Sequence, residues 1–264
     1  PEAFRAIGCE VTIEDEDVAP GVELPSTWDE FLAGLRKKDR HELRRKLRRL
    51  EGAGEVRVVE STRETLEDDF ATFCHLMAES SDEKREFMLP QRAAFFRRVV
   101  DWTMEAGYLR LQFLELDGEK LSATMSFDYG GKRLLYNSGY RVEHRSLAVG
   151  LMLKALCVKD AIERGLTYFD FLRGPEPYKY DLGGQNVGLH RIVVAHQQQP
   201  MMGIGRIVVI RKTEAVPRVE PAQVGVEAVV GSTDRGGAGG GHGVLRVVVQ
   251  RSTISSLGIF PPGS

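Results

Sequence analysis

A basic residue and a glycine flank the start of a predicted helix in the middle of the chain. Arg145 lies just before this helix and Gly150 lies in its first turn. A helix start presents free backbone N–H groups and the positive end of the helix dipole, so it attracts anions. A diphosphate would suit these groups. The alternative interpretation is that Arg145 is a solvated loop residue and that Gly150 lets the helix pack closely.

These residues belong to an α/β unit formed by consecutive elements. A helix is predicted over 150–164, because its apolar residues recur at three- and four-residue spacing: Leu151, Ala155, Val158 and Ile162. Gly165 ends the helix as a C′ glycine. The aromatic run 166–172 (LTYFDFL) predicts a buried strand, which Arg173-Gly174-Pro175 terminates. A polar elbow follows this strand.

The segments RSLAVG (145–150) and ERGLTYFDFLRGPEPYKYDLG (163–183) resemble the GNAT acyltransferase superfamily, in particular its cellulose-biosynthesis-associated (CelD-like) and Fem-like members. That family holds the pyrophosphate of acetyl-CoA with an Arg/Gln-x-x-Gly-x-Gly/Ala loop. The resemblance implies a cofactor site made of Arg145, Ser146, Leu147, Ala148, Val149 and Gly150. Ala148 departs from the pattern, because it places a β-carbon where the family has a glycine that lets the backbone approach phosphate. The second signature, Asp-x-x-Arg-Gly-x-Glu-x-Tyr-Lys, is matched by Asp170, Arg173, Gly174, Glu176, Tyr178 and Lys179.

Acyl transfer from a thioester to an amine needs a polarised carbonyl, a deprotonated acceptor and an acid for the leaving thiolate. Positioned hydrogen bonds supply most of this, so we predict direct transfer without a covalent nucleophile. We predict the catalytic residues to be Asp170, Tyr178 and Lys179. We predict the substrate-binding residues to be Asp128, Tyr136, Arg173 and Glu176. A structural role is the alternative for these residues, for example an Asp170 carboxylate that pairs with Arg173 and holds the elbow.

Composition excludes several classes of protein. The 264 residues are 42% hydrophobic and 28% charged, which suits a globular core and excludes disorder of the whole chain. The net charge of −2 gives no overall attraction to nucleic acid or anionic lipid. No apolar run has the length of a membrane span, and we expect a cytoplasmic protein. The cysteines (Cys9, Cys74 and Cys157) and six histidines are scattered, so we predict reduced thiols and no metal.

A long, basic, amphipathic helix is predicted over 28–50. Its apolar face comprises Phe31, Leu32, Leu35, Leu43, Leu47 and Leu50, and arginines and lysines between positions 36 and 49 surround it. Such a surface can bind nucleic acid, anionic lipid or an acidic polymer, or can simply be a solvated face. The resemblance adds a third interpretation, because Fem-type relatives are tandem GNAT domains whose halves a basic helix often joins.

The remaining elements follow from periodicity and turn residues. Strands are predicted at 4–13, 55–60, 109–116, 120–129, 133–140, 189–195 and 204–210, with the last two closing the sheet. Asp117-Gly118 and Gly130-Gly131 provide two-residue hairpin turns. Helices are predicted at 65–78 and 91–106. The polar loop between them, 79–90, contains Phe87 and Met88 as candidate lid residues over the acceptor.

We therefore predict an α/β (α+β) fold with a GNAT-type, mixed, mostly antiparallel central sheet flanked by helices. Residues 1–26 would be a strand and connector left from a preceding GNAT half, since the chain starts at Pro1 without a signal sequence. Residues 27–212 would form the acyltransferase domain, and 213–264, rich in glycine, valine and proline, a flexible tail.

The predicted function is transfer of an acyl group from acetyl-CoA or another acyl-CoA to an amine or hydroxyl, on a small molecule, a saccharide or a cell-envelope precursor. Two alternatives stay open. One is Fem-like aminoacyl transfer from charged tRNA, with the basic helix against the RNA backbone. The other is a non-catalytic GNAT-like module that binds a polyanion through the same helix.

Overall fold

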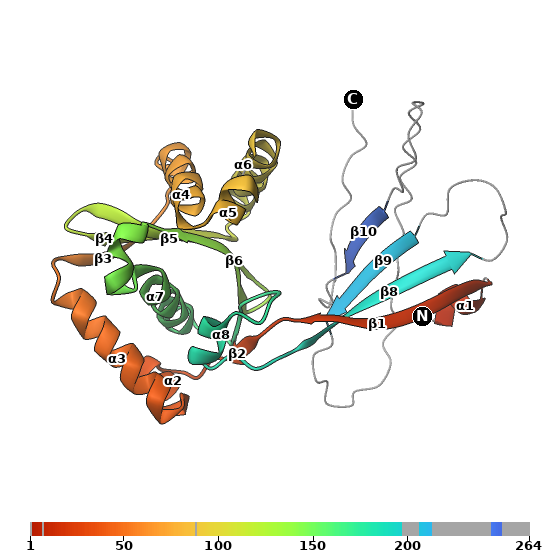
Figure 1. Ribbon diagram of the computed structural model, residues 1–264, viewed down its shortest axis with the longest axis horizontal. Helices are drawn as coiled ribbons and strands as arrows, with labels where there is room; N and C mark the ends of the chain where they lie inside the picture. The colour runs from red at the N-terminus through yellow and green to blue at the C-terminus, as the bar shows by residue number, and fades with distance from the viewer. Residues whose placement is uncertain (1, 7, 88, 197–205, 213–243, 250–264) are drawn as a thin grey trace. The chain divides into compact units, whose positions relative to one another are not determined.

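The computed structural model describes the whole chain except residues 1, 7, 88, 197–205, 213–243 and 250–264 (Figure 1). The chain divides into two compact units. One consists of residues 19–186, and the other combines residues 1–18 with residues 187–264.

The larger unit is built on a six-stranded sheet with the order β2-β7-β6-β5-β4-β3. Neighbouring strands are antiparallel, except that β6 and β7 are parallel. This arrangement confirms the predicted mixed, mostly antiparallel sheet. The strands are β2 (Gly21–Glu23), β3 (Val56–Glu60), β4 (Leu109–Leu116), β5 (Glu119–Tyr129), β6 (Lys132–Tyr140) and β7 (Tyr168–Asp170).

Both predicted hairpin turns are confirmed. Asp117 and Gly118 have φ values of 51° and 84°, and Gly130 and Gly131 have values of 58° and 76°. Two consecutive residues with positive φ form the turn whose twist matches that of antiparallel strands. These turns fix the register of the β4-β5-β6 meander.

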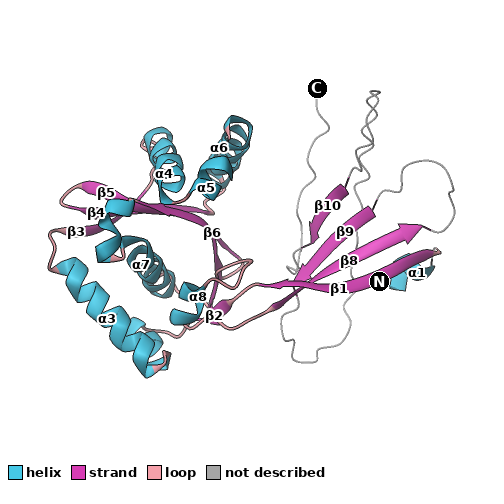
Figure 2. Ribbon diagram, in the orientation of Figure 1, coloured by secondary structure: helices cyan, strands magenta, loops and turns pink. Residues whose placement is uncertain are grey.

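Helices cover both faces of this sheet (Figure 2). On one face α2 (Trp28–Gly34), α3 (Lys37–Glu51) and α7 (Val149–Glu163) share a core with Leu114, Leu135 and Phe169. On the other face α4 (Leu66–Ser80) and α6 (Pro90–Glu105) share a second core with Leu111, Phe113 and Met125, and Phe87 of α5 (Asp82–Phe87) packs against it. The sheet is therefore the middle of three layers, flanked by helices as predicted.

The prediction of one continuous helix over 28–50 was wrong, because the backbone breaks between α2 and α3. Leu35 is extended (φ −68°, ψ 150°) and buried. The Arg40 guanidinium donates hydrogen bonds to the carbonyls of Ala33 (2.9 Å) and Leu35 (3.3 Å), which lie at the end of α2. With this break, apolar residues of both helices pack in the same core.

Three further local predictions were wrong. The predicted strand 4–13 begins within the helix α1 (Glu2–Ala6) and overlaps only the first half of the strand β1 (Cys9–Val18). The predicted connector 14–26 includes strand residues, and the predicted loop 79–90 includes α5. The strands predicted to close the sheet, observed as β8 (Gly188–His196) and β9 (Arg206–Lys212), do not join it. They form a four-stranded sheet with β1 and β10 (Val244–Val249), in the order β1-β8-β9-β10.

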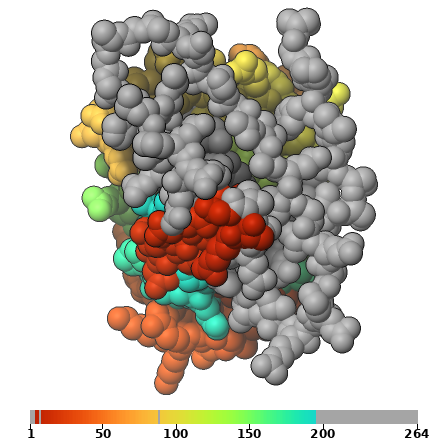
Figure 3. All heavy atoms as spheres, turned by 90° about the vertical axis from the view of Figure 1, so that its right-hand side faces the viewer, coloured from red at the N-terminus to blue at the C-terminus, as the bar shows by residue number. Residues whose placement is uncertain are grey.

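In this second unit β1 pairs antiparallel with β8 over most of its length. The side chains of β1 are mainly exposed or half-buried, and together with those of α1 they form a continuous red patch in Figure 3. Most of the predicted tail at 213–264 lies outside the described residues, as does Met88.

Candidate active site

The sheet of the larger unit splits between β6 and β7. β7 pairs only with the first three residues of β6, Lys132 to Leu134. Beyond Leu134, β6 continues to Tyr140, and no described strand pairs with it on that side. The chain leaves β7 through Leu172, whose φ is 58°. Residues 135–140 therefore form an open strand edge with which an extended ligand can pair.

Tyr136 is a β-bulge in this open part of β6. Met125 pairs with Asn137 and Ser126 with Leu135, so Tyr136 is the extra residue. A bulge changes the direction of a side chain and bends the strand. The Tyr136 ring packs on Phe96 at 5.3 Å between centroids, and burial raises the pKa of its hydroxyl. Its predicted contact with substrate stays a prediction.

The predicted cofactor residues form one turn around the start of α7. A 3₁₀ turn, η1 (Val142–Leu147), leads to Ala148, which is left-handed (φ 54°, ψ 34°). Leu151 and Met152 donate to the Ala148 carbonyl at 2.9 Å, so the N–H groups of Val149 and Gly150 precede the first helical acceptor. Arg145 and Ser146 are exposed, and Leu147 is half-buried. Within the described residues, Arg145 has no ion-pair partner.

Close packing of α7 is the structural role of Gly150. A β-carbon there would lie 3.0 Å from Cδ1 of Tyr140, the last residue of β6. Gly139 plays a similar role toward the other layer, since a β-carbon on it would lie 2.3 Å from the backbone nitrogen of Met77 in α4. The open half of β6 is therefore held tightly between α4 and α7.

Asp170 and Lys179 hold the elbow that follows β7. The Asp170 carboxylate is buried and accepts a hydrogen bond from the Leu172 N–H (2.9 Å). The buried Lys179 ammonium donates to the carbonyls of Leu172 (3.0 Å), Arg173 (2.9 Å) and Gly174 (3.0 Å). Lys179 also lies 2.8 Å from a Glu176 carboxylate oxygen. These contacts support a positioning role for both residues, and direct catalysis by either stays a prediction.

Tyr178 differs from the other two predicted catalytic residues, because its polar group makes no hydrogen bond to another described residue. It lies in the short helix α8 (Pro177–Asp181), and its ring meets Phe171 edge to face. Burial raises the pKa of the Tyr178 hydroxyl well above its usual range. The phenol therefore stays protonated at neutral pH and can act as a hydrogen-bond or proton donor.

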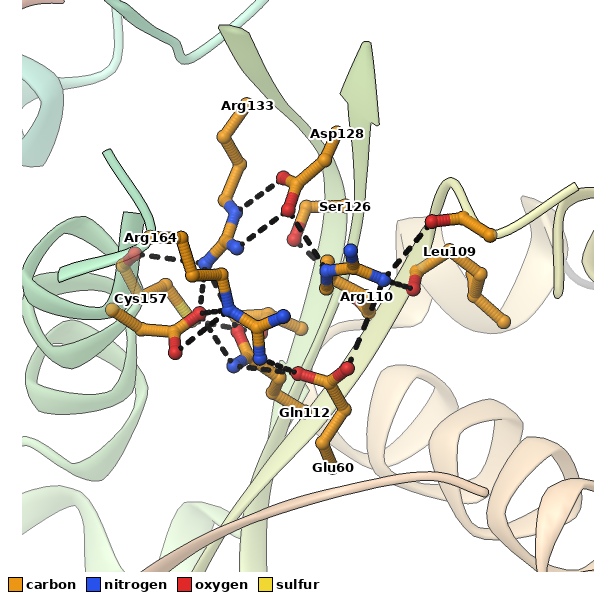
Figure 4. Close-up of polar contacts among 12 residues, drawn as sticks. Glu60, Leu109, Arg110, Gln112, Ser126, Asp128, Arg133, Cys157 and Arg164 are labelled. Atoms are coloured by element: carbon orange, nitrogen blue, oxygen red, sulfur yellow. Dashed lines mark hydrogen bonds and ion pairs between the residues drawn. The ribbon is translucent and has the colours of Figure 1, made fainter. Parts of the chain in front are cut away.

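Asp128 belongs to a partly buried ion network at the end of the sheet where β6 pairs with β7 (Figure 4). Its carboxylate accepts from Arg133 at 2.7 and 2.8 Å and from Arg110 at 2.8 Å. Arg133 is fully buried and also contacts Asp160 at 2.6 Å. Asp160 lies ten residues beyond Gly150 on α7, or about 15 Å along the helix. The network, which Glu60 and Arg164 complete, balances three arginines with three carboxylates.

Two lysines that the sequence analysis did not single out lie at the open edge. Lys154 on α7 is 7% exposed and donates to the Gly150 carbonyl at 3.1 Å. Burial lowers the pKa of Lys154 to about 8. Lys84 on α5 donates to the Ser138 carbonyl in the open part of β6. Lys154 is the one charged residue in the apolar run 149–158, a signal that could have revealed it, whereas Lys84 has no such signal.

A surface pocket of about 350 Å³ adjoins the first turn of α7. It lies between α3, α7 and the end of α8, and three of its lining residues are basic. The lining comprises Arg36, Lys38, Asp39, Glu42, Leu43, Lys46, Leu151, Asp181 and Leu182. Asp39 pairs with Arg36 at 2.5 Å and Glu42 with Lys46 at 3.4 Å, so Lys38 is the basic lining residue without an ion pair in the described chain.

Cys157 is buried, and burial raises the pKa of its thiol to about 11, which makes it a poor nucleophile. Among the described residues no cluster of histidine, cysteine or carboxylate side chains is arranged to hold a metal ion. None of the described helices combines the length and apolar character needed to cross a bilayer.

Comparison with known proteins identifies the family. No curated protein matches the chain. The structure is similar to that of FemX, at 16% identity and a TM-score of 0.55 over 70% of this chain and 65% of that one. It is also similar to the C-terminal domain of a putative lysylphosphatidylglycerol synthetase from Agrobacterium fabrum, at 11% identity and a TM-score of 0.50 over 73% and 63% of the two chains. The chain thus spans under two thirds of either relative. A family model described as an acetyltransferase (GNAT) domain matches residues 37–180, more than half of the chain, which therefore belongs to the GNAT acetyltransferase family.

Proposed function

We propose that this GNAT domain transfers an acyl group from acyl-CoA directly to an amine or hydroxyl of an acceptor. The observation that carries the proposal is the open edge of β6 directly beside the N-terminus of α7. One element offers backbone groups to an extended chain and the other offers N–H groups to a diphosphate. Acyl-CoA contains both kinds of group in one molecule.

The donor would lie along these two elements in order. Its diphosphate would accept hydrogen bonds from the N–H groups of Val149 and Gly150, with Arg145 alongside. Its two pantetheine amides would pair with the backbone between residues 135 and 140. The pocket lined by Arg36, Lys38 and Lys46 adjoins the same turn of α7 and offers basic groups to the phosphate-bearing nucleotide end.

The proposed reaction needs no covalent enzyme intermediate. The acceptor nitrogen or oxygen attacks the thioester carbon, the new C–N or C–O bond forms, and the C–S bond breaks. The acceptor loses one proton to a base, and the departing thiolate gains one. The hydroxyl of Tyr178 is our candidate for the acid, because it is protonated at neutral pH and makes no hydrogen bond to another side chain among the described residues. Asp170 and Lys179 hold the elbow that carries it.

We propose a saccharide or cell-envelope precursor as the acceptor and the cytoplasm as the location. The sequence resemblance to cellulose-biosynthesis-associated and Fem-like members and the similarity to a putative lysylphosphatidylglycerol synthetase support this acceptor class. One observation also favours a second donor, an aminoacyl-tRNA. Five basic residues of α3 are exposed and have no ion-pair partner within the described residues: Lys37, Lys38, Arg44, Arg48 and Arg49.

Calorimetric titration with acetyl-CoA tests the proposed donor. The wild type should bind, and Arg145→Ala should weaken binding by about 1 to 3 kcal/mol, because the guanidinium makes a charge-assisted bond to phosphate. Arg63→Ala is the matched control, because Arg63 is also an exposed arginine. It lies three residues after Glu60, which pairs with Arg164 at the opposite, C-terminal end of α7. Equal affinity for acetyl-CoA in the wild type and both variants would show that the diphosphate does not bind at this turn.

Salt dependence distinguishes the second donor. If α3 binds RNA, affinity for tRNA should fall steeply with added salt, and replacing Arg44, Arg45 and Arg48 by glutamate should abolish it while the protein stays folded. Tight acetyl-CoA binding together with tRNA affinity that does not depend on salt would rule out the RNA role.

A further inference from the structure

Two lysines approach the open part of β6 from opposite layers of the larger unit. Lys84 comes from α5, in the layer that α4 and α6 also form, and donates to the Ser138 carbonyl. Lys154 comes from α7, in the other layer, and lies 4.8 Å above the ring of Tyr178. Their charges act on each other, since Lys84 contributes to lowering the pKa of Lys154. Beyond Leu134, where β6 no longer pairs with β7, no described strand separates the two layers on that side of β6.

Neither lysine is neutralised. Within the described residues, no carboxylate lies within ion-pair distance of Lys84 or Lys154. Glu176 is the acidic group whose charge reaches both, and it is already paired with Lys179 at 2.8 Å. The other titratable groups that act on Lys154 or touch it, Cys157 and Tyr178, are thiol and phenol with raised pKa values. Glu83, the neighbour of Lys84 on α5, also acts on Lys84, but neither Glu83 nor Glu176 lies within ion-pair distance of Lys84 or Lys154 in the described part of the chain.

Placing these ammonium groups together destabilises the folded protein unless an anion binds between them. Burying an ammonium group without a counter-ion is strongly unfavourable, and apolar residues surround this position on α7. The Nζ atom of Lys154 has three protons, and one is donated to the Gly150 carbonyl. The ammonium also lies over the ring of Tyr178 in α8, and no other hydrogen-bond acceptor for it is found among the described residues.

We propose that Lys84 and Lys154 form a binding site for an ionised carboxylate or phosphate group of the acceptor. The assignment to the acceptor rests on the proposed function, in which the donor diphosphate occupies the turn at Arg145. Lys84 lies on α5, in the opposite layer from that turn, and this is the ground for assigning the pair to the acceptor and not to the donor diphosphate. The acceptor class is therefore an amine or alcohol that also carries an acidic group.

Titration with inorganic phosphate at constant ionic strength tests the site. The wild type should bind phosphate saturably at pH 7, and Lys84→Met and Lys154→Met should each weaken binding at least about 10-fold, as loss of a charge-assisted bond does. Lys159→Met is the matched control and should bind as the wild type does, because Lys159 is a half-exposed lysine of the same helix that pairs with Glu163. Unsaturable binding, or equal affinity in all four proteins, would overturn the proposal.

Proton uptake provides a second readout that a merely structural role would not change. At pH 8.5 much of Lys154 is uncharged, so phosphate binding should draw in a fraction of a proton. Calorimetry in two buffers of different ionisation enthalpy should detect this uptake in the wild type and not in Lys154→Met. Identical uptake in both proteins would place the anion elsewhere.

Repeating the phosphate titration in the presence of saturating acetyl-CoA tests whether the two lysines bind a group of the acceptor or a group of the donor. Phosphate that still binds belongs to an acceptor position, as proposed. Phosphate that acetyl-CoA excludes would show that the lysines hold a group of the donor, which would overturn the acceptor assignment. If acetyl-CoA itself does not bind, the proposed donor fails, while the titrations of the lysine variants without acetyl-CoA still decide whether the anion site exists.

Discussion

Replacing Lys154 by methionine should stabilise the protein. Burial lowers the pKa of Lys154 from an ordinary 10.5 to about 8. Each pKa unit corresponds to about 1.36 kcal/mol, so the charged lysine costs the folded state about 3 kcal/mol at neutral pH. Methionine has a similar length, carries no charge and suits the apolar surroundings. Loss of the hydrogen bond to the Gly150 carbonyl offsets about 1 kcal/mol, which leaves a net gain of about 2 kcal/mol.

The stability gain from Lys154→Met should depend on pH. Because the folded pKa lies below the unfolded pKa, the unfolded chain binds more protons between about pH 8 and pH 10.5. The cost is therefore fully present below pH 8 and disappears as pH rises through this window. The advantage of Lys154→Met over the wild type should be largest at pH 7 and should shrink at pH 9.5.

Urea unfolding at the two pH values measures this difference, with Lys159→Met as the control. Lys159 is half-exposed and lies 3.7 Å from Glu163, so its replacement should change the free energy of unfolding by less than about 1 kcal/mol. A Lys154→Met variant that is less stable than the wild type at pH 7, or whose advantage does not shrink at pH 9.5, would refute the reasoning.

Three further predictions concern stability and need only urea unfolding. Ala148→Gly should stabilise the protein by up to about 1 kcal/mol, because residue 148 has a positive φ that costs alanine more than glycine; a clear loss of stability would contradict this. Gly139→Ala should cost about 3 kcal/mol, because its β-carbon would meet the backbone of α4 at 2.3 Å, and an unchanged midpoint would show that α4 moves freely. Arg133→Met should cost about 3 kcal/mol, the low end for breaking a buried ion pair, because the part-buried Asp128 and Asp160 lose their shared partner but keep Arg110 and Arg164; a loss below about 1 kcal/mol would mean that water replaces the guanidinium.

Much of the larger unit was predictable because its signals are local. The β4-β5-β6 meander follows from alternating strands joined by turns with positive φ, and α7 and β7 follow from periodicity and an aromatic run. The pairings β1–β8 and β2–β7 join segments far apart in sequence, so neither leaves a local pattern. The break at Leu35 also escaped prediction, because the apolar spacing continues across it and only packing against the core requires the bend.

The candidate site was predictable only in part. The turn at the start of α7 follows from a basic residue and a glycine before an apolar helix. The contacts of Lys179 with three elbow carbonyls depend on the left-handed Leu172, which no residue type signals. Lys154 stands out as a charge in an apolar run, whereas the meeting of Lys84 with β6 exists only once α5 is folded over the sheet.

Hydrogen exchange with and without acetyl-CoA is the most direct test of donor binding at the split sheet. Saturating acetyl-CoA should slow the exchange of amides in two segments, 135–140 and 146–151, and should leave the amides around the Asp128 network unchanged. Protection confined to other segments, or no protection at concentrations that saturate binding, would contradict placement of the donor between the open edge of β6 and the N-terminus of α7.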